Sequence, residues 1–518
     1  MEDHYNEPLL SNSEDGQIII HEDDHKTFLP ENEEPHSMPS ISYSRDDPLK
    51  NGNVGDLLKE FLAELKKVWN LAGPSIFSSV CQYGIGAFTQ IYVGQLGTVQ
   101  LAAFSVENSV IADFGYSILA GMGSALETLC GQAYGAKQYR MLGIYMQKSW
   151  FLLNISVVPM ILLFIFATPV LRFLGQDATI SKEAGTFALW MIPQQFAYAT
   201  FIPLSKFLQA QSKVMEMAVI AAFALCTHSI LGWFVILKLG WGLPAAAVML
   251  NASWWFMAVA QFLYVVLWTG GAQAWSGFSS KALTNLSGFF KLSVSSALMS
   301  CLGMWYMMGV ILVAGFLKNA EVSVAALSVC LNILGWASMV GSGFNAAISV
   351  RVSNELGSGR SRAAKFAVMV VGITSTLFGL LFALVLLLQR KQYPALFSND
   401  NEVKQLVDEL TPMLAVSIIF GCIPLNGVAV GAGWQTIVAY MNVGSYFIFG
   451  APVGILMCYK FNKGLQGLWL GMLSGVCLQT LGVLLLIFLT NWHKEAHVAK
   501  KRLKKFEGET LALGDEEN

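Results

Sequence analysis

The sequence predicts an all-α polytopic membrane protein, in which twelve transmembrane helices form two parallel-repeat six-helix lobes around a central cavity. Three observations lead to this fold class. Apolar residues make up 54% of the 518 residues and charged residues only 13%, about half the charge density of a soluble domain. Apolar segments near the roughly 20 residues that a helix needs to cross a bilayer follow one another along the chain. Finally, parts of the first half recur in the second.

The internal repeat has a constant spacing. The segment 121–143 returns in weaker form at 343–359, and the aligned glycines Gly135 and Gly357 are 357 − 135 = 222 residues apart. Further matches join Gly242 to Gly464, Ala103 to Ala326 and Pro203 to Pro424 at spacings of 222, 223 and 221. Six crossings in each half mean that both halves enter the membrane from the same side, which predicts parallel repeats about an axis along the membrane normal.

The chain divides into five predicted parts. Residues 1–60 are acidic and poor in apolar side chains, which predicts a disordered cytoplasmic tail. We expect a first lobe over 61–275, a cytoplasmic loop over 276–285, a second lobe over 286–492 and a charged cytoplasmic tail over 493–518. The predicted crossings, in order, are 73–96, 104–128, 148–172, 184–208, 216–238, 245–269, 289–316, 323–348, 364–388, 411–431, 434–459 and 465–490.

Basic residues in short loops predict the orientation, because cytoplasmic loops of membrane proteins are enriched in Lys and Arg. The loops after the second, fourth, sixth, eighth and twelfth crossings hold most of them, including Lys137, Arg140, Lys148, Lys206, Lys213, Lys281, Lys291, Arg351, Arg360, Arg362 and Lys365. This face and both termini are therefore expected to be cytoplasmic. The basic C-terminal tail has the composition for contact with anionic lipid, but its acidic end favours a solvated helix.

Several blocks of sequence, in order, are similar to one known family. They are 125–135 (Ala-Leu-Glu-Thr-Leu-Cys-Gly-Gln-Ala-Tyr-Gly), 206–213, 351–357 (Arg-Val-Ser-Asn-Glu-Leu-Gly), 427–435 and 490–495. The chain resembles, over roughly residues 60–505, the plant DETOXIFICATION branch of the multidrug and toxic compound extrusion (MATE) family. The resemblance implies structural roles for Glu127, Gly131, Gln132, Gly135, Arg351, Asn354, Glu355, Gly433, Trp434 and Gln435.

The same resemblance implies two six-helix lobes and the export of organic solutes against a proton or sodium gradient. In plants such solutes include flavonoids, alkaloids, organic acids, hormones and xenobiotics, and some members are described as anion conductances. We expect the vacuolar membrane as the location, with the plasma membrane as the alternative. The expected partners are a small organic solute, a proton gradient in preference to a sodium gradient, and membrane lipid; we expect a monomer that binds no nucleic acid.

Titratable groups inside the membrane are the candidates for proton coupling, because desolvation favours a carboxyl group that binds and releases a proton. These are Glu107 and Asp113 on the second crossing and His228 on the fifth. Glu107 and Asp113 are six residues apart, so a regular α-helix places them about 120° apart and on different faces. His228 has a suitable titration range for a proton relay, but packing between helices is the favoured interpretation. Glu127 is expected to bind a backbone amide or a neighbouring base.

The seventh crossing departs from the family pattern. Plant relatives read Leu-Glu-x-Trp there, with the glutamate regarded as a coupling residue, whereas this chain reads Cys-Leu-Gly-Met-Trp-Tyr over 301–306 and has Gly303 at that position. The second lobe thus holds no carboxylate inside its predicted spans. Coupling then resides in the first lobe, through Glu107 or Asp113, or transport is uncoupled. A glycine that merely permits close helix packing is compatible with both.

Aromatic and amide side chains suggest an amphipathic cavity for planar, hydroxylated solutes. The candidate lining residues are Gln82, Tyr83, Gly303, Trp305, Tyr306 and Trp336, with Trp254 and Trp255 as further aromatics. For each aromatic taken singly, packing or a place at the lipid interface is the favoured interpretation. Lys291 is the one base nearby, so neutral, zwitterionic or cationic solutes suit this cavity better than polyanions.

Three functions remain in order of preference. The first is a secondary-active efflux transporter, linked to protons by antiport. The second is an uncoupled facilitator or an anion conductance for chloride or organic acids, as suggested by Gly303. An intramembrane enzyme is third, because the sequence lacks His-Glu-x-x-His and Gly-x-Ser-x-Gly. A P-loop is absent, so energy comes from a gradient, and we expect no cofactor and no metal site.

Overall fold

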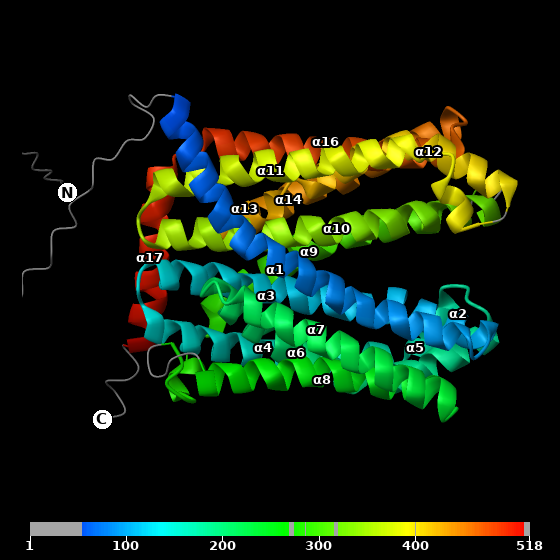
Figure 1. Ribbon diagram of the computed structural model, residues 1–518, viewed down its shortest axis with the longest axis horizontal. Helices are drawn as coiled ribbons and strands as arrows, with labels where there is room; N and C mark the ends of the chain where they lie inside the picture. Colours follow the sequence, from blue (N-terminus) through cyan, green and yellow to red (C-terminus); the bar gives the residue numbers. More distant parts are fainter. Residues whose placement is uncertain are drawn as a thin grey trace, which may run out of the picture. The chain divides into compact units, whose positions relative to one another are not determined.

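The computed structural model describes residues 54–268, 274–284, 286–314, 317, 320–398 and 400–511, and over these residues the regular structure is helical without strands (Figure 1). Most of the predicted disordered tail lies outside the described residues. Its last part, 54–60, is helical, so the predicted boundary at 60 is wrong. Residues 54–60 are exposed, and α1 first packs against the second half farther along, with Val68 and Leu71 in one apolar cluster with Phe344.

The helices follow the chain in order. The first half contains α1 Val54–Gly94, α2 Thr98–Val106, η1 Glu107–Ala112, α3 Asp113–Gly135, α4 Tyr139–Ile165, α5 Ala167–Phe173, α6 Ala178–Ala210, α7 Val214–Gly232, η2 Trp233–Lys238 and α8 Gly242–Trp268. The short η3 Ser280–Ala282 lies between the halves. The second half contains α9 Leu286–Ala314, α10 Ala320–Gly357, α11 Ser361–Leu388, η4 Tyr393–Leu396, α12 Asn401–Cys422, α13 Leu425–Ala432, α14 Gln435–Asn442, η5 Val443–Gly450, α15 Ala451–Ile455, η6 Leu456–Lys460 and α16 Gly464–Leu489, followed by α17 Trp492–Leu511.

All twelve predicted crossings coincide with helical segments. Ten segments of the described chain are long and apolar enough to cross a membrane. The first and fourth predicted crossings lie in α1 and α6, which are not among these ten. The reason for α6 is visible in its buried polar side chains: Gln194, Gln195 and Gln209 lower its apolar content, yet they face other helices instead of lipid.

Each half has its own apolar core. One cluster of buried side chains comes from residues 81–258 and another from residues 306–472. Between the halves, α1 and α3 contact α9 and α10. The 222-residue spacing makes α9 the counterpart of α1 and α10 the counterpart of α3. The interface between the halves is therefore built from two pairs of equivalent helices.

The tenth predicted crossing is not one continuous helix. Helix α12 ends at Cys422 and α13 begins at Leu425, because Pro424 lacks the N–H group that a continuous helix requires. Near this break, the Asn345 side-chain oxygen accepts a hydrogen bond from the Gly427 N–H at 2.7 Å. A side chain from α10 thus satisfies a backbone donor that the interrupted helix leaves without an intrahelical partner.

The basic C-terminal tail forms a helix, α17, that lies across the ends of the membrane helices of both halves (Figure 1). Trp492, Leu503 and Phe506 are at most 8% exposed, so one face of α17 is packed against the protein. The expectation of a solvated helix is therefore wrong for this face, and its acidic end, 515–517, lies outside the described residues. We call this end of the structure the α17 end.

Candidate functional site

The two halves meet at the α17 end, where α3 crosses α10. Gly131 on α3 lies against Ser353 on α10: a Cβ atom placed on Gly131 would lie 1.9 Å from the Ser353 Oγ. These two residues are 353 − 131 = 222 apart and therefore occupy equivalent positions in the repeat. A residue contacts its own counterpart only near a two-fold axis. The pseudo-two-fold axis thus passes between Gly131 and Ser353.

The same close backbone approach occurs twice around this axis. A Cβ on Gly135 would lie 2.0 Å from the Asn354 carbonyl oxygen, and a Cβ on Gly357 would lie 2.0 Å from the Gln132 carbonyl oxygen. The spacing of 222 relates Gly135 to Gly357 and Gln132 to Asn354. Only glycine permits backbones to approach this closely. We call the six residues Gly131, Gln132, Gly135, Ser353, Asn354 and Gly357 the axial contact.

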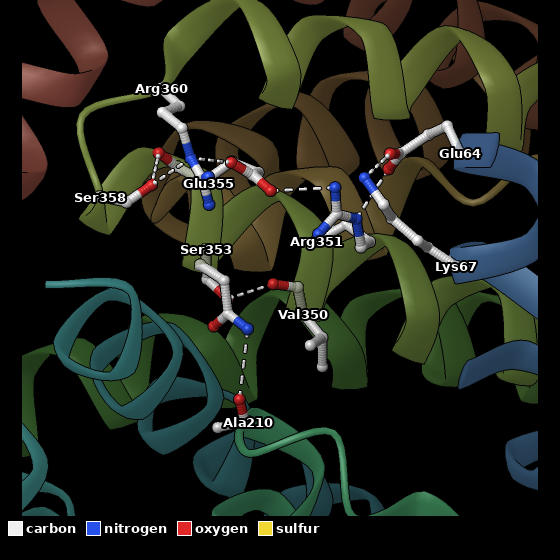
Figure 2. A network of polar contacts seen from close by, with 10 residues as sticks. Glu64, Lys67, Ala210, Val350, Arg351, Ser353, Glu355, Ser358 and Arg360 are labelled. Atoms are coloured by element: carbon white, nitrogen blue, oxygen red, sulfur yellow. Dashed lines mark hydrogen bonds and ion pairs between the residues drawn. The ribbon is translucent and has the colours of Figure 1, made fainter. Parts of the chain in front are cut away.

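Side-chain amides of the axial contact bind backbone in the opposite half. The Gln132 Nε2 donates to the Gly431 carbonyl at 3.2 Å. The Asn354 Nδ2 donates to the Ala210 carbonyl at 3.3 Å, and Figure 2 shows this bond reaching Ala210. Gly431 and Ala210 are 431 − 210 = 221 residues apart, the spacing that also relates Pro424 to Pro203. Each amide therefore satisfies a carbonyl in the last turn of a helix, α13 or α6, that has no intrahelical partner.

Two further hydrogen bonds join the halves in this region. Neither bond has an equivalent at the positions related by the repeat. The Thr128 Oγ1 donates to the Val430 carbonyl at 2.6 Å, and the Gln435 Nε2 lies 2.6 Å from the same Thr128 oxygen. Both join α3 of the first half to α13 or α14 of the second. The family-motif residue Gln435 thus acts between the halves.

A row of ion pairs lies beside Ser353 of the axial contact (Figure 2). The Arg351 Nε lies 2.7 Å from the Glu64 Oε1 and its Nη2 lies 2.9 Å from the Glu355 Oε1. Glu355 also pairs with Arg360 at 2.7 Å, and Glu64 with Lys67 at 3.2 Å. The side chains of Glu64 and Glu355 are only 7% and 5% exposed, so both carboxylates depend on their partners. Arg351 links α1 of the first half to α10 of the second.

We expect Arg351→Met to lower the free energy of unfolding by about 1.5–3 kcal/mol, because two buried carboxylates lose their shared partner and keep only the more exposed Lys67 and Arg360. Chemical unfolding of the purified full-length chain in detergent measures this change. The matched control is Arg390→Met, which breaks an exposed pair with Asp408 (46% and 32% exposed) and should cost less than about 1 kcal/mol. Equal losses in the two variants would show that the Arg351 network is no stronger than a surface ion pair.

A further buried ion pair lies within the first half, between α3 and α6. The Glu127 Oε2 lies 2.7 Å from the Lys206 Nζ, and the Glu127 side chain is 5% exposed. This ion pair joins α3 to α6 next to the axial contact. Glu127 therefore has a partner on a neighbouring helix and does not face the interface between the halves as a free carboxylate.

Helix α17 is attached to the axial contact through Arg502. Its Nη1 donates to the Gln132 Oε1 at 3.0 Å and to the Ala432 carbonyl at 3.3 Å. Gly433 ends α13 with a φ of +81° and a Cβ there would lie 2.4 Å from the Arg502 Nη1, so both conformation and space require glycine. The Trp434 Nε1 donates to the Glu495 Oε2 at 3.1 Å. Arg502 was not singled out from the sequence, because no motif marks it.

Farther from the α17 end, two aromatic pairs bridge the halves. Tyr83 on α1 meets Trp336 on α10 with ring centroids 4.9 Å apart, and Phe114 on α3 stacks on Trp305 of α9 at 6.0 Å. The spacing 305 − 83 = 222 and the spacing 336 − 114 = 222 make these pairs equivalent. Three predicted cavity residues thus lie at the interface, 37–44% exposed. Phe114 was missed, although the repeat spacing applied to Trp336 would have found it.

The other predicted residues of the seventh crossing lie differently. Tyr306 is 4% exposed, stacks on Tyr446 at 5.0 Å and donates to the Gly471 carbonyl at 3.2 Å, so it packs within the second half. A Cβ on Gly303 would have a single neighbour within 4 Å, the Tyr446 Cε2 at 3.8 Å. Close packing therefore does not require glycine at position 303, and that interpretation is wrong.

Three more candidates for the cavity have partners in their own half. The Gln82 Nε2 donates to Ser78 on the same helix at 2.9 Å. Trp254 is buried against Tyr198, with ring centroids 4.6 Å apart. The Trp255 Nε1 donates to the Pro193 carbonyl at 3.1 Å. These contacts support packing as a role for both tryptophans.

The first half encloses a polar group without a counterpart in the second. Glu107 is fully buried in the π-helical η1, and neither of its carboxylate oxygens has a hydrogen-bond partner among the described residues. Gln195 on α6 is also buried with an unpartnered amide and lies against Gly115. Asp113 begins α3 beside the Phe114–Trp305 pair and is half-buried. The wider η1 changes the angle of about 120° expected between Glu107 and Asp113 for a regular helix.

His228 lies elsewhere in the first half. Its Nε2 is 2.9 Å from the Thr89 Oγ1 and its Nδ1 is 2.7 Å from the Ser253 Oγ, and the ring is 1% exposed. It therefore connects α1, α7 and α8. Both ring nitrogens bond to hydroxyl groups that also lie against backbone carbonyls. This geometry supports packing more than proton relay.

The two halves differ in the carboxyl groups that they place inside the membrane. At the spacing of 222, the positions that correspond to Glu107 and Asp113 are Val329 and Gly335. The backbone is duplicated, but these two carboxyl groups are not. A proton site formed by Glu107 or Asp113 therefore belongs to the first half alone.

Comparisons with known proteins identify relatives of the whole chain. The MatE family model matches residues 74–234 and again residues 295–456, so that the two matches start 295 − 74 = 221 residues apart. The chain is 53% identical to Protein DETOXIFICATION 29 of Arabidopsis thaliana over 94% of this chain and 97% of that protein. It is 53% identical to Protein DETOXIFICATION 30 of the same plant, over 93% and 97%. Among solved structures it resembles the eukaryotic MATE transporter AtDTX14, with a TM-score of 0.82 and 35% identity over 86% of this chain and 99% of that one.

Proposed function

Because this chain belongs to the MatE family of membrane transporters, we propose that it is a proton-linked antiporter that exports organic solutes by alternating access. The single observation that supports this mechanism is the axial contact, in which the two halves meet through the same interactions on either side of a pseudo-two-fold axis. Two equivalent rigid halves that meet at an axis can rock against each other and expose the space between them to either side in turn.

The described structure corresponds to one end of this cycle. The axial contact, the Arg351 network and Arg502 hold the halves together at the α17 end. In Figure 1 the ribbons of the two halves separate from there toward α2 and α12. Because alternating access closes one end at a time, we assign the structure to the state that is closed at the α17 end and open opposite.

The α17 end is the cytoplasmic face in this proposal, so the state is outward-facing. Lys137, Lys213 and Arg360 lie in the loops at this end, and cytoplasmic loops are enriched in such residues. Both termini are then cytoplasmic. The vacuolar membrane remains the favoured location, with the plasma membrane as the alternative.

Proton coupling is assigned to Glu107 and Asp113. They precede Gly131 by 24 and 18 residues, which is about 36 Å and 27 Å of helix, so they lie on the open side. An ionised carboxylate without a partner in an enclosed site costs several kcal/mol, so the enclosed Glu107 favours the protonated form until movement of the halves admits solvent. With Gly303 at the family's seventh-crossing position, the predicted spans of the second half contain no carboxylate for this role.

The aromatic pairs suggest the class of solute. Tyr83, Trp305 and Trp336 offer ring faces at the interface, and Asp113 is the adjacent acid. Ring faces and a carboxylate suit a planar organic solute that is neutral or cationic. The second candidate function, an uncoupled facilitator or anion conductance, is favoured by Gly303 alone.

Transport in proteoliposomes tests this proposal. With the membrane voltage clamped at zero, we expect vesicles with an acidic interior to accumulate a planar fluorescent cation such as ethidium, because outward proton flow drives its uptake. Collapsing the pH gradient with an ionophore should abolish this accumulation. Uptake that ignores the pH gradient, together with a current carried by chloride alone, would support the conductance and contradict antiport.

A further inference from the structure

A pocket of about 390 Å³ opens at the α17 end between α9, the start of α14 and α17. Its ten described lining residues come from 288–295 of α9, from Thr436 and from 498–506 of α17. We call it the basic pocket. It lies outside the interface that carries the solute in the proposed function, and none of its residues takes part in proton coupling.

The charge of the basic pocket points to an anionic ligand. Four of its lining residues are bases, Lys291, Lys501, Arg502 and Lys505, and none of the ten described lining residues is acidic. Ser295 and Thr436 add two hydroxyl groups that can donate hydrogen bonds. Several positive charges around a small volume attract a multiply charged anion, and hydroxyl and guanidinium donors suit phosphate oxygens.

Arg502 shows that this positive charge is built into the structure. Its Nη1 is held by the Gln132 Oε1 and the Ala432 carbonyl, both of which are neutral acceptors. Burial lowers the pKa of the Arg502 guanidinium, because its charged form is only partly compensated, by the more distant Glu495. An anion in the pocket would supply the missing negative charge.

The position of the pocket indicates where this anion comes from. Lys291 and Leu292 lie in the second turn of α9, at the start of the apolar segment Leu286–Ile311. The pocket therefore opens at the level where a membrane helix leaves the bilayer. Its apolar lining, Leu292, Val498 and Phe506, lies beside the bases, a combination that suits a phosphate attached to a glycerol backbone and acyl chains.

We propose that the basic pocket binds the phosphate headgroup of an anionic membrane lipid of the phosphomonoester type and thereby stabilises the closed α17 end. The lipid would contact α9, α14 and α17 together. Arg502, which lines the pocket, also donates a hydrogen bond to Gln132 in the axial contact. The level of the pocket in the bilayer rests on the membrane orientation in the proposed function. Binding itself does not depend on proton coupling or on the identity of the solute.

The test measures lipid binding to the full-length chain in nanodiscs of phosphatidylcholine with or without phosphatidic acid. We compare the wild type with Lys291→Gln/Lys501→Gln/Lys505→Gln. The matched control is Lys494→Gln/Lys500→Gln/Lys504→Gln, which removes the same charge from exposed positions of α17 outside the pocket. We expect phosphatidic acid to raise the melting temperature of the wild type and the control. In the pocket variant its apparent affinity should fall by more than about tenfold, because each base near an anionic lipid contributes about fivefold.

Two outcomes would overturn the proposal. Equal loss in the two triple variants would show a diffuse electrostatic attraction without a pocket. Equal stabilisation by soluble glycerol 3-phosphate, at the same affinity as the lipid, would show that the pocket takes a free phosphate and not a lipid. Because the readout is a melting temperature, failure of pH-driven transport leaves this result unaffected, and failure of lipid binding leaves the antiport test unaffected.

Discussion

Replacing Gly135 or Gly357 with alanine should reduce transport about fivefold or more, because overpacking of this kind costs roughly 1–3 kcal/mol in the state where the backbones touch. The added Cβ would lie 2.0 Å from a carbonyl oxygen in the opposite half, and backbone cannot move aside as a flexible side chain does. Both variants should retain each half's own core. Solute uptake in proteoliposomes, normalised to the amount of folded protein, measures the effect.

Two other helical glycines that no side chain or backbone approaches provide the controls. Gly335 lies on α10 and Gly86 on α1, and a Cβ on either would meet nothing within 4 Å. Gly335→Ala and Gly86→Ala should therefore transport at close to the wild-type rate. Because the two axial glycines are equivalent, Gly135→Ala and Gly357→Ala should have similar effects. A large loss in one and none in the other would contradict the two-fold arrangement of the contact.

Removing the two carboxyl groups to which proton coupling is assigned should abolish pH-driven uptake. We expect Glu107→Gln and Asp113→Asn together to reduce uptake driven by the pH gradient at least about tenfold, since neither amide releases a proton. Uptake down the solute's own concentration gradient should persist, because the cavity keeps nearly the same shape. The two gradients, imposed separately in the same proteoliposome preparation, distinguish loss of coupling from loss of folding.

The control for these carboxyl substitutions is Glu216→Gln. Glu216 begins α7 and accepts a hydrogen bond from the Tyr264 hydroxyl at 3.0 Å, so it is an acid at the edge of the membrane with a partner. This variant should keep its dependence on the pH gradient. If the Glu107/Asp113 double variant keeps it as well, the assignment of coupling to the first half is wrong.

A carboxyl group can also be restored to the second half. Position 303 has room for a side chain, since the one neighbour of a Cβ there is Tyr446 at 3.8 Å. In the Glu107/Asp113 double variant, Gly303→Glu should therefore fold and recover part of the pH-driven uptake. Absence of any recovery would mean that a carboxyl group at position 303 does not take part in proton coupling in this protein.

Sequence patterns predicted most of the helical architecture because each pattern depends on a single segment. Apolar stretches located all twelve crossings to within a few residues at most ends, and the repeat spacing identified equivalent helices. The errors lie at the two ends of the described chain. Helix α1 begins at Val54 inside a segment read as disordered, and α17 packs through Leu503 and Phe506 although its charge suggested solvent.

The candidate site divides in the same way. The sequence singled out Glu107 and Asp113 because a charge in an apolar segment is unusual wherever the helix packs. It also singled out Gly131, Gly135 and Gly357, but without the reason for glycine at these positions. That reason is a contact between segments more than two hundred residues apart, which no local pattern contains.

The membrane character of this protein, the number of its crossings and the repetition of its halves follow from the sequence, because hydropathy and repetition are properties of the chain alone. Which residues of the two halves meet became clear from the folded structure. The pairs Glu64–Arg351 and Gln132–Arg502 join helices distant in the chain. Such contacts depend on how each helix is rotated and tilted against its neighbours, and many rotations bury the same apolar residues.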